Sequence, residues 1–489
     1  MPNTLDHTTE TTEPIVTALP MVSRKDPQVL ARERAALAAA NEQPPLKRAV
    51  IFARLSGPGW LQGAMTLGGG TAAASLFAGS LLGYRLLWLQ PVAMLTGIIM
   101  LNALAYQTLS TEMRPFQAFR RFVHPAMAWG WALAALLASI VWHFPQYNLS
   151  AAVIANMAAQ AGMDLSSNGA KTIVCFFILI LVTAITWTYN RGSRFMRTYE
   201  NIMKLFVAVV IISFAAVAFK TGIQWGPVLH GFLGEPWQLG GVTVPFGKLY
   251  VPWGDARAMG VLIAAFAAAV GINMTFLLPY SMLARGWGRE HRPLARFDLS
   301  VGLFLPFVLA TTFVIIAAAN VVHPNYVPGT PPPGAVAFAG AIEPVVGRTL
   351  SHWVFGLGIL GMTMSTIPLH MLVCGFIAVE IFKVNPTGWG YRLATLIPAP
   401  AFLAPLLWGK LEFWLAVPTS VLCFILLPIA YIGFWVLHNS LRYLGADRPE
   451  GTRRLVWNVL LGTIVIIVTA GSLYLAVTKS VEWLGKLAG

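Results

Sequence analysis

The chain is poor in charged residues and nearly free of cysteine. Only 11% of its 489 residues are Asp, Glu, Lys or Arg, whereas soluble domains carry about 25%. The three cysteines, Cys175, Cys374 and Cys423, all lie in apolar runs, so no disulfide framework is expected. Because 57% of the residues are hydrophobic, the composition excludes a soluble domain and indicates a polytopic membrane protein.

The motifs of enzymes are missing as well. The run GGGTAAAS at residues 68–75 lacks the lysine of a phosphate-binding loop and lies in an apolar segment. The sequence contains no Ser/His/Asp arrangement and no clustered metal ligands. We therefore expect no enzymatic activity and no cofactor.

Long apolar runs predict an all-α protein with about eleven transmembrane helices. A polar stretch, residues 1–56, precedes them, and we expect it to be a disordered or loosely helical cytoplasmic tail rather than a cleaved signal peptide. The predicted spans are Gly57–Leu82, Leu86–Ser110, Met127–Ala161, Lys171–Tyr189, Ile202–Thr221, Ala258–Ala284, Leu299–Val322, Leu350–Phe382, Ala394–Trp408, Phe413–Leu437 and Leu455–Val477.

Basic residues are unevenly distributed between the two sides of these spans. Most of the 33 Lys and Arg residues fall on the side of the N-terminus. The nine on the other side are Arg85, Lys171, Lys220, Lys248, Arg257, Arg348, Lys410, Lys479 and Lys486. This asymmetry predicts a protein of the inner (cytoplasmic) membrane with a cytoplasmic N-terminus and an external C-terminus. It also explains the net charge of +14 by topology and contact with membrane lipids, without a nucleic-acid partner.

Two spans contain a weak point near their centres. The first has the consecutive glycines Gly68, Gly69 and Gly70, followed by Thr71, and each glycine weakens a helix by about 1 kcal/mol relative to alanine. The sixth contains Gly271-Ile272-Asn273-Met274-Thr275. A separation of five spans is typical of an inverted repeat of two five-helix halves, whose broken helices form a transport site. The alternative is a stripe of small residues for close helix packing.

The third span carries polar residues at mid-membrane depth. His143 and Gln146 flank Pro145, which frees a backbone carbonyl in a helix. Intramembrane polar groups are candidates for function, and His143 could respond to protons because histidine titrates near neutral pH. A kinked helix with internally bonded polar groups explains the same pattern equally well.

Several of these residues resemble a known family. The motif GPGWL at Gly57 and the segment LFAGSLLGYRLLW ending at Trp88 are similar to the first span of the Nramp (natural resistance-associated macrophage protein) family of proton-coupled divalent-metal transporters. The end of span six and Leu427-Pro428 in span ten fit the same family more loosely. The resemblance implies the LeuT-like fold of the amino acid–polyamine–organocation superfamily. It predicts a transporter core at 57–437, with repeats at 57–222 and 258–437, and an added eleventh helix within 438–489.

The sequence departs from this family at the metal site. The family's Asp-Pro-Gly-Asn falls on Gly68 to Thr71, and its Met-Pro-His falls on Ile272-Asn273-Met274. The glutamine of span ten falls on Ser420, and the paired acids of span three fall within 144–147. Neither break has an Asp or Glu nearby, although a divalent cation taken from water requires hard oxygen ligands, usually with a carboxylate.

We therefore predict a secondary transporter that moves a small anionic or zwitterionic solute by alternating access, with a proton or cation as a possible coupling ion. The N-terminus of the half-helix after Gly68 offers free N–H donors and a partial positive charge. The predicted substrate-binding residues are Gly68, Gly69, Gly70, Thr71, Gly271, Asn273, Met274 and Thr275, with His143, Gln146 and Ser420 as proton-coupling or gating residues. Two alternatives stay open: a divalent-metal (Mg²⁺- or Mn²⁺-like) transporter with an acid-free site, and a channel or receptor that has lost transport.

Overall fold

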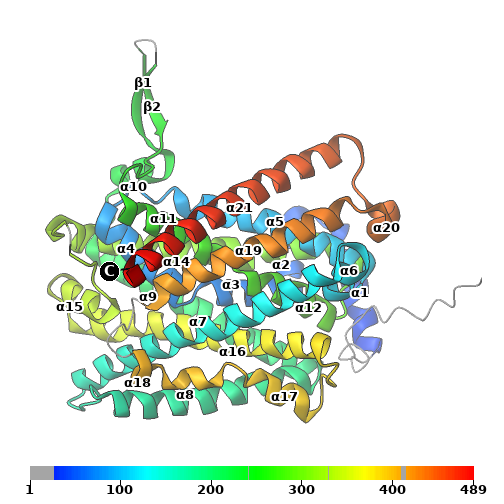
Figure 1. Cartoon of the computed structure of the whole chain (residues 1–489), viewed down its shortest axis with the longest axis horizontal. Coiled ribbons are helices and arrows are strands. Elements are labelled where there is room, and N and C mark those ends of the chain that lie inside the picture. The colour runs from blue at the N-terminus through cyan, green and yellow to red at the C-terminus, as the bar shows by residue number, and fades with distance from the viewer. Residues whose placement is uncertain (1–26, 240–241, 329, 409–414, 489) are drawn as a thin grey trace, which may run out of the picture.

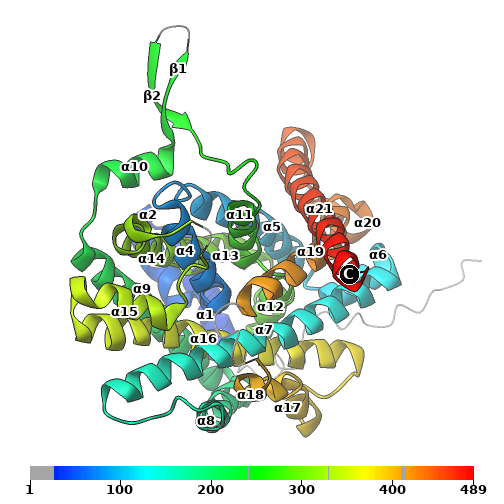
Figure 2. The same ribbon diagram turned by 60° about the vertical axis from the view of Figure 1, so that its left-hand side comes forward.

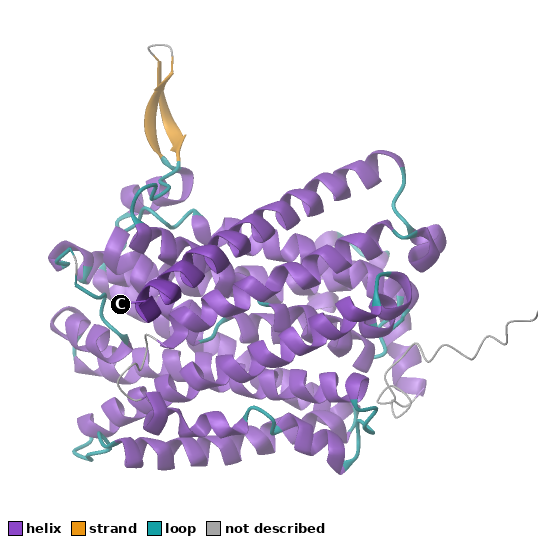
Figure 3. Ribbon diagram, viewed as in Figure 1, coloured by secondary structure: helices purple, strands orange, loops and turns teal. Residues whose placement is uncertain are grey.

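The computed structural model describes residues 27–239, 242–328, 330–408 and 415–488. Helices make up nearly all of this part of the chain (Figure 3). Two strands, β1 (Glu235–Leu239) and β2 (Val242–Lys248), form an antiparallel hairpin that projects from one end of the helical bundle (Figure 1). We call this the hairpin end, and we call the opposite end, which holds α6 (Pro115–Phe122) and α20 (Leu441–Leu444), the α6 end.

Ten helices are long and apolar enough to cross a membrane, and a bent pair supplies an eleventh span within the described ranges. In chain order the spans are α3 (Pro58–Thr66) with α4 (Gly69–Leu82), α5 (Leu89–Thr111), α7 (Pro125–Gln160), α8 (Asn168–Thr188), α9 (Ser193–Thr221), α11 (Ala256–Ala269) with α12 (Ile272–Ala284), α13 (Arg292–Leu299) with α14 (Leu305–Val321), α16 (Phe355–Ile381), α17 (Trp389–Thr395) with α18 (Ala404–Trp408), α19 (Ala416–Asn439) and α21 (Gly451–Ala488). The predicted number of spans is thus confirmed.

Shorter elements connect the spans. The remaining α-helices are α1 (Pro27–Asn41), α2 (Pro45–Leu55), α10 (Trp225–Leu233) and α15 (Ala335–Val346). Single π-helical turns at Ser300–Phe304 and Thr349–Val354 lead into α14 and α16. The 3₁₀ turns are Tyr189–Arg191, Arg289–His291, His323–Asn325, Ala399–Leu403 and Gly445–Asp447. The described part of the predicted tail is therefore helical, and its Arg34 pairs with Glu290 at 2.7 Å.

The broken spans lie inside the bundle. The α4 helix packs against α14 and α11, α12 packs against α7 and α16, and α16 in turn packs against α7 and α9 (Figures 1 and 2). Helix α21 packs on α19 at the periphery of the bundle. Nearly every residue of α3, α4 and α12 is buried, so both breaks are enclosed by protein, as non-helical backbone in a membrane requires.

The first break is a short non-helical segment between α3 and α4. Leu67 ends α3 with φ −79° and ψ 60°, and Gly68 is extended before α4 begins. The two half-helices meet at a bend of 53°. In the sixth span, Val270 and Gly271 are both extended between α11 and α12. Both interruptions that the sequence predicts are therefore present.

Hydroxyl groups bond the carbonyls that the breaks expose. Thr66 Oγ1 donates to the carbonyl oxygens of Ala269 and Ala268, at 2.8 and 2.9 Å, and Thr71 Oγ1 donates to the carbonyl oxygen of Thr66. Buried backbone groups without partners are costly, and these bonds remove that cost. They also join the end of α3 to the end of α11, so the two breaks form one structural unit.

Candidate functional site

The two breaks face each other across a small cavity of about 30 Å³, which is room for a water molecule or two. Residues from four spans line it: Met65, Thr66, Gly68, Gly70, Thr71, Trp142, Gln146, Ala267, Ala268, Gly271, Asn273, Met274, Thr366 and His370. Residues more than 300 positions apart in sequence thus share one enclosed space at the centre of the bundle.

Hydrogen bonds fix the orientation of two amide side chains in this cavity. Gln146 Oε1 accepts from the Gly69 N–H at 2.9 Å, and Asn273 Oδ1 accepts from the Met274 N–H at 3.0 Å. Because a backbone N–H can only donate, each amide oxygen is assigned to the backbone and each NH₂ group is directed elsewhere. The Nε2 of Gln146 and the Nδ2 of Asn273 make no hydrogen bond within the described ranges, and both residues line the cavity. Side-chain donors therefore face the empty space.

The first turn of α4 adds backbone donors. The N–H groups of the first residues of any helix have no partner within that helix. Gly69 donates to Gln146, and Gly70 and Thr71 follow it along the cavity wall. The N-terminus of a helix also carries about half a positive charge. Helix α12 begins at Ile272 beside the same cavity. The C-terminal ends of α3 and α11 line it too, so the ends of four half-helices, two of each partial charge, meet at this point.

Packing around the glycines leaves no room for larger residues. A β-carbon on Gly70 would lie 2.1 Å from Cη2 of Trp142, and one on Gly68 would lie 2.9 Å from Oγ1 of Thr366. Both distances are far inside van der Waals contact. A side chain at either position would occupy the space in which a solute could approach the backbone.

No acidic residue lines the cavity. In the part of the chain that the structure describes, no group of three or more His, Cys, Asp or Glu side chains is placed to hold a metal ion. Two thioethers, those of Met65 and Met274, line the cavity, and Met274 Sδ accepts from the Gly271 N–H at 3.4 Å. The site therefore offers amides, hydroxyls, two thioethers and one imidazole.

Seven of the eight residues predicted to bind substrate lie at the two breaks, and one points away. Thr275 accepts a hydrogen bond from Trp131 Nε1 at 2.9 Å and donates to the Ile272 carbonyl at 2.6 Å. Neither Thr275 nor Gly69 is among the residues that line the cavity, but Gly69 donates its N–H to the lining residue Gln146. One residue corresponds to about 100° of helix rotation, which turns Thr275 toward α7 while Asn273 and Met274 stay at the cavity.

The three residues predicted to couple protons or to gate the site lie in three different places. Gln146 lines the small cavity. His143 lies one turn earlier on α7, where its Nδ1 is 2.9 Å from the Ser139 carbonyl oxygen and its ring centroid is 5.3 Å from that of His370. Ser420 lines a different cavity and donates to the Ala416 carbonyl at 2.8 Å.

Sequence reasoning missed Trp142, Thr366 and His370 as site residues. Trp142 and Gln146 are four residues apart on α7, and Thr366 and His370 are four apart on α16. Residues with this spacing share one face of a helix. The spacing was visible in the sequence, but the face of α16 that meets the breaks depends on tertiary packing.

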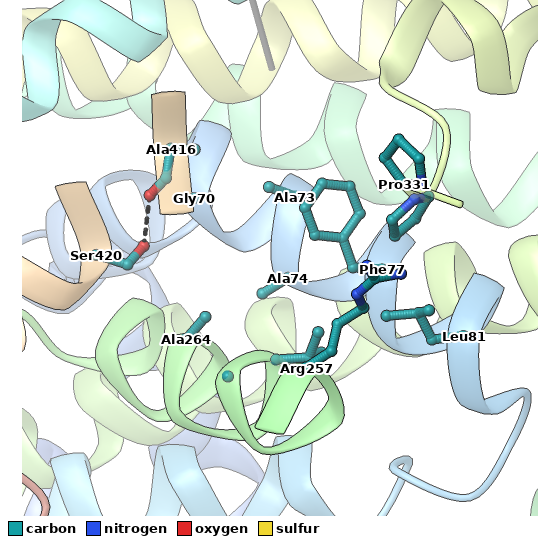
Figure 4. A pocket seen from close by; sticks show the side chains of 13 residues that line it. Gly70, Ala73, Ala74, Phe77, Leu81, Arg257, Ala264, Pro331, Ala416 and Ser420 are labelled. Atoms are coloured by element: carbon teal, nitrogen blue, oxygen red, sulfur yellow. Dashed lines mark hydrogen bonds between the residues drawn. The ribbon is translucent and has the colours of Figure 1, made fainter. Parts of the chain in front are cut away.

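A larger cavity of about 530 Å³ extends from the breaks toward the hairpin end. It shares Gly70 with the small cavity and runs along Ala73, Phe77 and Leu81 of α4 (Figure 4). Arg257 reaches across its outer part, where its guanidinium donates to the Thr330 carbonyl at 2.9 Å. Apart from Arg257 and Ser420, the residues that line it carry no polar side chain.

Hydrogen bonds and a buried ion pair join the helices at the α6 end. Asp298 Oδ2 accepts from the Gly59 and Gly57 N–H groups at 2.7 and 3.1 Å and thereby fixes the start of α3 against α13. Beside it, the buried Arg285 pairs with Glu200 at 2.8 Å.

Comparisons with known proteins agree on the class. The model of the family "Natural resistance-associated macrophage protein-like" (Nramp) matches residues 59–478. No curated protein matches the chain. A manganese transporter of Eremococcus coleocola, solved with an aromatic bis-isothiourea compound, is similar in structure with a TM-score of 0.67 at 15% identity, covering 86% of this chain and 85% of that one.

Two other solved transporters share the fold. MhsT in complex with L-phenylalanine has a TM-score of 0.53 at 15% identity and covers 86% of this chain and 97% of that one. Mhp1, a nucleobase-cation-symport-1 family transporter, has a TM-score of 0.51 at 14% identity over 86% and 92% of the two chains. At these identities the likeness shows the fold alone, which confirms the predicted LeuT-like architecture.

The family match covers most of the chain, including both interrupted spans. The apolar helices and the shared architecture place it in the membrane as a multi-pass protein. The chain belongs to the Nramp family and is a transporter, not an enzyme.

Proposed function

We propose that this transporter works by alternating access and moves a small solute that carries a carboxylate or another oxyanion, either as an anion or as a zwitterion. The observation that carries the proposal is the fixed orientation of Gln146 and Asn273, whose amide oxygens bond the backbone and whose NH₂ groups face the cavity. With the first turn of α4, these groups form a donor-rich pocket. Such donors stabilise negative charge and repel cations.

The small cavity would have to widen when a solute binds. Its present volume of about 30 Å³ holds no solute larger than water. The larger cavity meets it at Gly70, so a modest rotation of α4 or of the Trp142 side chain would join them. In this scheme the structure corresponds to a state that is open toward the hairpin end and closed at the α6 end.

A divalent-metal transporter is the second candidate. Family membership and the similarity to a manganese transporter favour it, and Met274 and His370 are side chains that bind transition metals. The Thr66 and Thr71 hydroxyls donate their protons to backbone carbonyls and so keep their lone pairs for a cation. Against it, both amide oxygens already accept hydrogen bonds from backbone N–H groups. No carboxylate among the lining residues offsets the cost of removing water from Mg²⁺ or Mn²⁺.

Proton coupling is assigned to the third span. His143 is buried beside His370, and its Nε2 has no hydrogen-bond partner in the described part of the chain. A group of this kind can take up a proton when the cavity opens. We assign proton-coupling or gating roles to His143, to Gln146 and to Ser420, which lines the larger cavity.

The orientation follows from charge. Because the number of spans is odd, the first span begins and the last span ends on opposite sides of the membrane. Helix α21, the last span, ends near the hairpin end (Figure 1). Because basic residues concentrate on the N-terminal side, we place the α6 end in the cytoplasm and the hairpin end outside an inner membrane. The repeat boundaries 57–222 and 258–437 remain predictions.

Flux into proteoliposomes tests the substrate class. Purified protein is reconstituted, and uptake is followed for a panel of amino acids and organic acids and, in parallel, for Mn²⁺ and Mg²⁺. We expect saturable uptake of at least one carboxylate and none of either cation. Saturable Mn²⁺ uptake without carboxylate uptake would establish the second candidate, and a lack of flux for every solute would favour a protein that has lost transport.

A further inference from the structure

A cavity of about 450 Å³ lies between α6 and the end of α16, far from the helix breaks. Its lining residues are Arg114, Phe116, Gln117, Arg120, Val379, Glu380, Lys383, Val384, Asn385 and Pro386. Helix α6 is amphipathic, with Phe116 and Phe119 buried and Arg120 exposed in the last turn. The transport site uses none of these residues.

The charge of this α6–α16 cavity is positive. Its single acid, Glu380, accepts a hydrogen bond from the Tyr280 hydroxyl at 2.8 Å and lies 3.5 Å from Arg114 Nε. Arg114 therefore balances the buried carboxylate. Arg120 and Lys383 line the same cavity and make no ion pair in the described ranges. Three cations and one carboxylate therefore line the cavity, which leaves it with an excess of positive charge.

The cavity lies where two spans end. Helix α5 ends at Thr111, three residues before Arg114, and α16 ends at Ile381, two residues before Lys383. The ends of membrane spans lie at the level of the lipid headgroups. The lining charges are therefore placed where phosphate esters are concentrated.

Exposed aromatic residues lie close in sequence or in space to residues that line the cavity. Phe382 and Trp389 are each 66% exposed, and they flank the loop that carries Lys383. Trp129 is 41% exposed and packs edge-on against Phe116, with ring centroids 5.9 Å apart. Aromatic side chains at this level contact acyl chains and glycerol backbones. A free phosphate ion would gain nothing from such surroundings.

We propose that the α6–α16 cavity binds the phosphate headgroup of an anionic glycerophospholipid. Arg120 and Lys383 contact the phosphate oxygens, and the acyl chains lie along Phe382 and Trp389. Basic pockets between spans on the cytoplasmic side suit anionic headgroups, and arginine forms strong charge-assisted bonds to phosphate. The binding site is independent of the solute that the protein transports.

Lipid competition tests the proposal. The protein is placed in nanodiscs of phosphatidylcholine with a minor fraction of phosphatidylglycerol, and the lipids that remain bound after extraction are counted by native mass spectrometry. We expect phosphatidylglycerol to be retained preferentially. Because each surface cation contributes about 1 kcal/mol, Arg120→Gln with Lys383→Gln should lower that preference on the order of 30-fold. Arg121→Gln is the matched control, since Arg121 is the neighbouring cation, lies over the Phe122 ring and does not line the cavity.

Two outcomes would overturn the proposal. One is an equal preference for phosphatidylglycerol in the double variant and in the wild type, with the variant's melting temperature in pure phosphatidylcholine unchanged. The other is that inorganic phosphate, added to phosphatidylcholine nanodiscs, displaces the bound phosphatidylglycerol completely at low concentration, which would assign the cavity to a free anion. If the double variant does not fold, Arg120→Gln alone should lower the preference about fivefold.

Discussion

The side-chain oxygen of Gln146 accepts a hydrogen bond from the backbone N–H of Gly69 at 2.9 Å. This contact joins α7 to the first turn of α4, and it decides which end of the amide faces the small cavity. The same logic holds for Asn273 and the Met274 N–H. The chemical character of the site follows from these two bonds, and each can be tested.

Gln146→Glu reverses the charge preference of the site without changing its shape. The carboxylate can still accept from Gly69, but it can no longer donate to a bound oxyanion, and its charge repels one. A hydrogen bond to a charged group contributes about 1.5–3 kcal/mol, so binding of the transported anion should weaken at least about tenfold. Isothermal titration measures this. Gln160→Glu at the exposed end of α7 is the control, and an equal loss in both variants would contradict the assigned role of Gln146.

Gly70→Ala should impair transport because there is no space for a methyl group. Its β-carbon would lie 2.1 Å from the Trp142 ring, and overpacking of this kind costs about 1–3 kcal/mol. The Trp142 ring must shift to make room for the methyl group. Gly130→Ala, on the same helix as Trp142, has no atom nearer than 3.8 Å and should transport normally. Initial rates of uptake, normalised to folded protein, compare the two. Full activity in Gly70→Ala would place the solute elsewhere.

Glu200→Gln should loosen the closed α6 end. It breaks a buried pair with Arg285 at 2.8 Å, and removing one partner of such a pair costs about 3–5 kcal/mol. The states closed at the hairpin end should become more populated, and a cysteine introduced at Leu81 in the larger cavity should react more slowly with a thiol reagent. Labelling of the natural cysteines should be slow, because all three are buried.

The control for this experiment is Glu343→Gln, which removes an acid that pairs with His352 away from the α6 end. Labelling at Leu81→Cys should be the same there as in the unaltered background. If Glu200→Gln speeds labelling or leaves it unchanged, the Arg285–Glu200 pair does not hold the α6 end closed.

Glu112 should make stability depend on pH. Burial raises the pKa of this carboxyl, the Glu290 carboxylate raises it further, and Arg34 opposes the shift. A raised folded-state pKa means that ionised Glu112 is harder to accommodate in the fold than in the unfolded chain, so it destabilises at neutral pH and not at acid pH, where it is protonated in both states.

Glu112→Gln should therefore raise the melting temperature at neutral pH. It should have little effect at acid pH, where the carboxyl group is protonated in both the folded and the unfolded chain. Thermal unfolding in detergent, followed by tryptophan fluorescence, checks this. Glu235→Gln, on the exposed hairpin strand β1, is the matched control. If Glu112→Gln raises the melting temperature by the same amount at acid and at neutral pH, the charge of Glu112 is not the cause of the change in stability.

Much of the architecture could be predicted from the sequence. Apolar runs of membrane length gave the number of spans, and the glycines at 68–70 and 271 marked both interruptions, because glycine signals a helix break locally. Thr275 could not be placed in this way, since a rotation of one residue decides whether it meets the cavity or Trp131. Thr366 and His370 join the site only through packing of α16 against α7 and α12, a contact between distant parts of the chain that no local pattern records.

The most direct measurement of the central claim is calorimetric titration of the purified protein with Mn²⁺, with Mg²⁺ and with the carboxylates of the flux panel, repeated for Asn273→Asp and Thr71→Ala. The orientation of the two amides predicts saturable binding of a carboxylate that Asn273→Asp weakens about tenfold or more, and no saturable heat with either cation. Saturable Mn²⁺ binding that Thr71→Ala abolishes would contradict the account, because it would show that the helix breaks hold a cation.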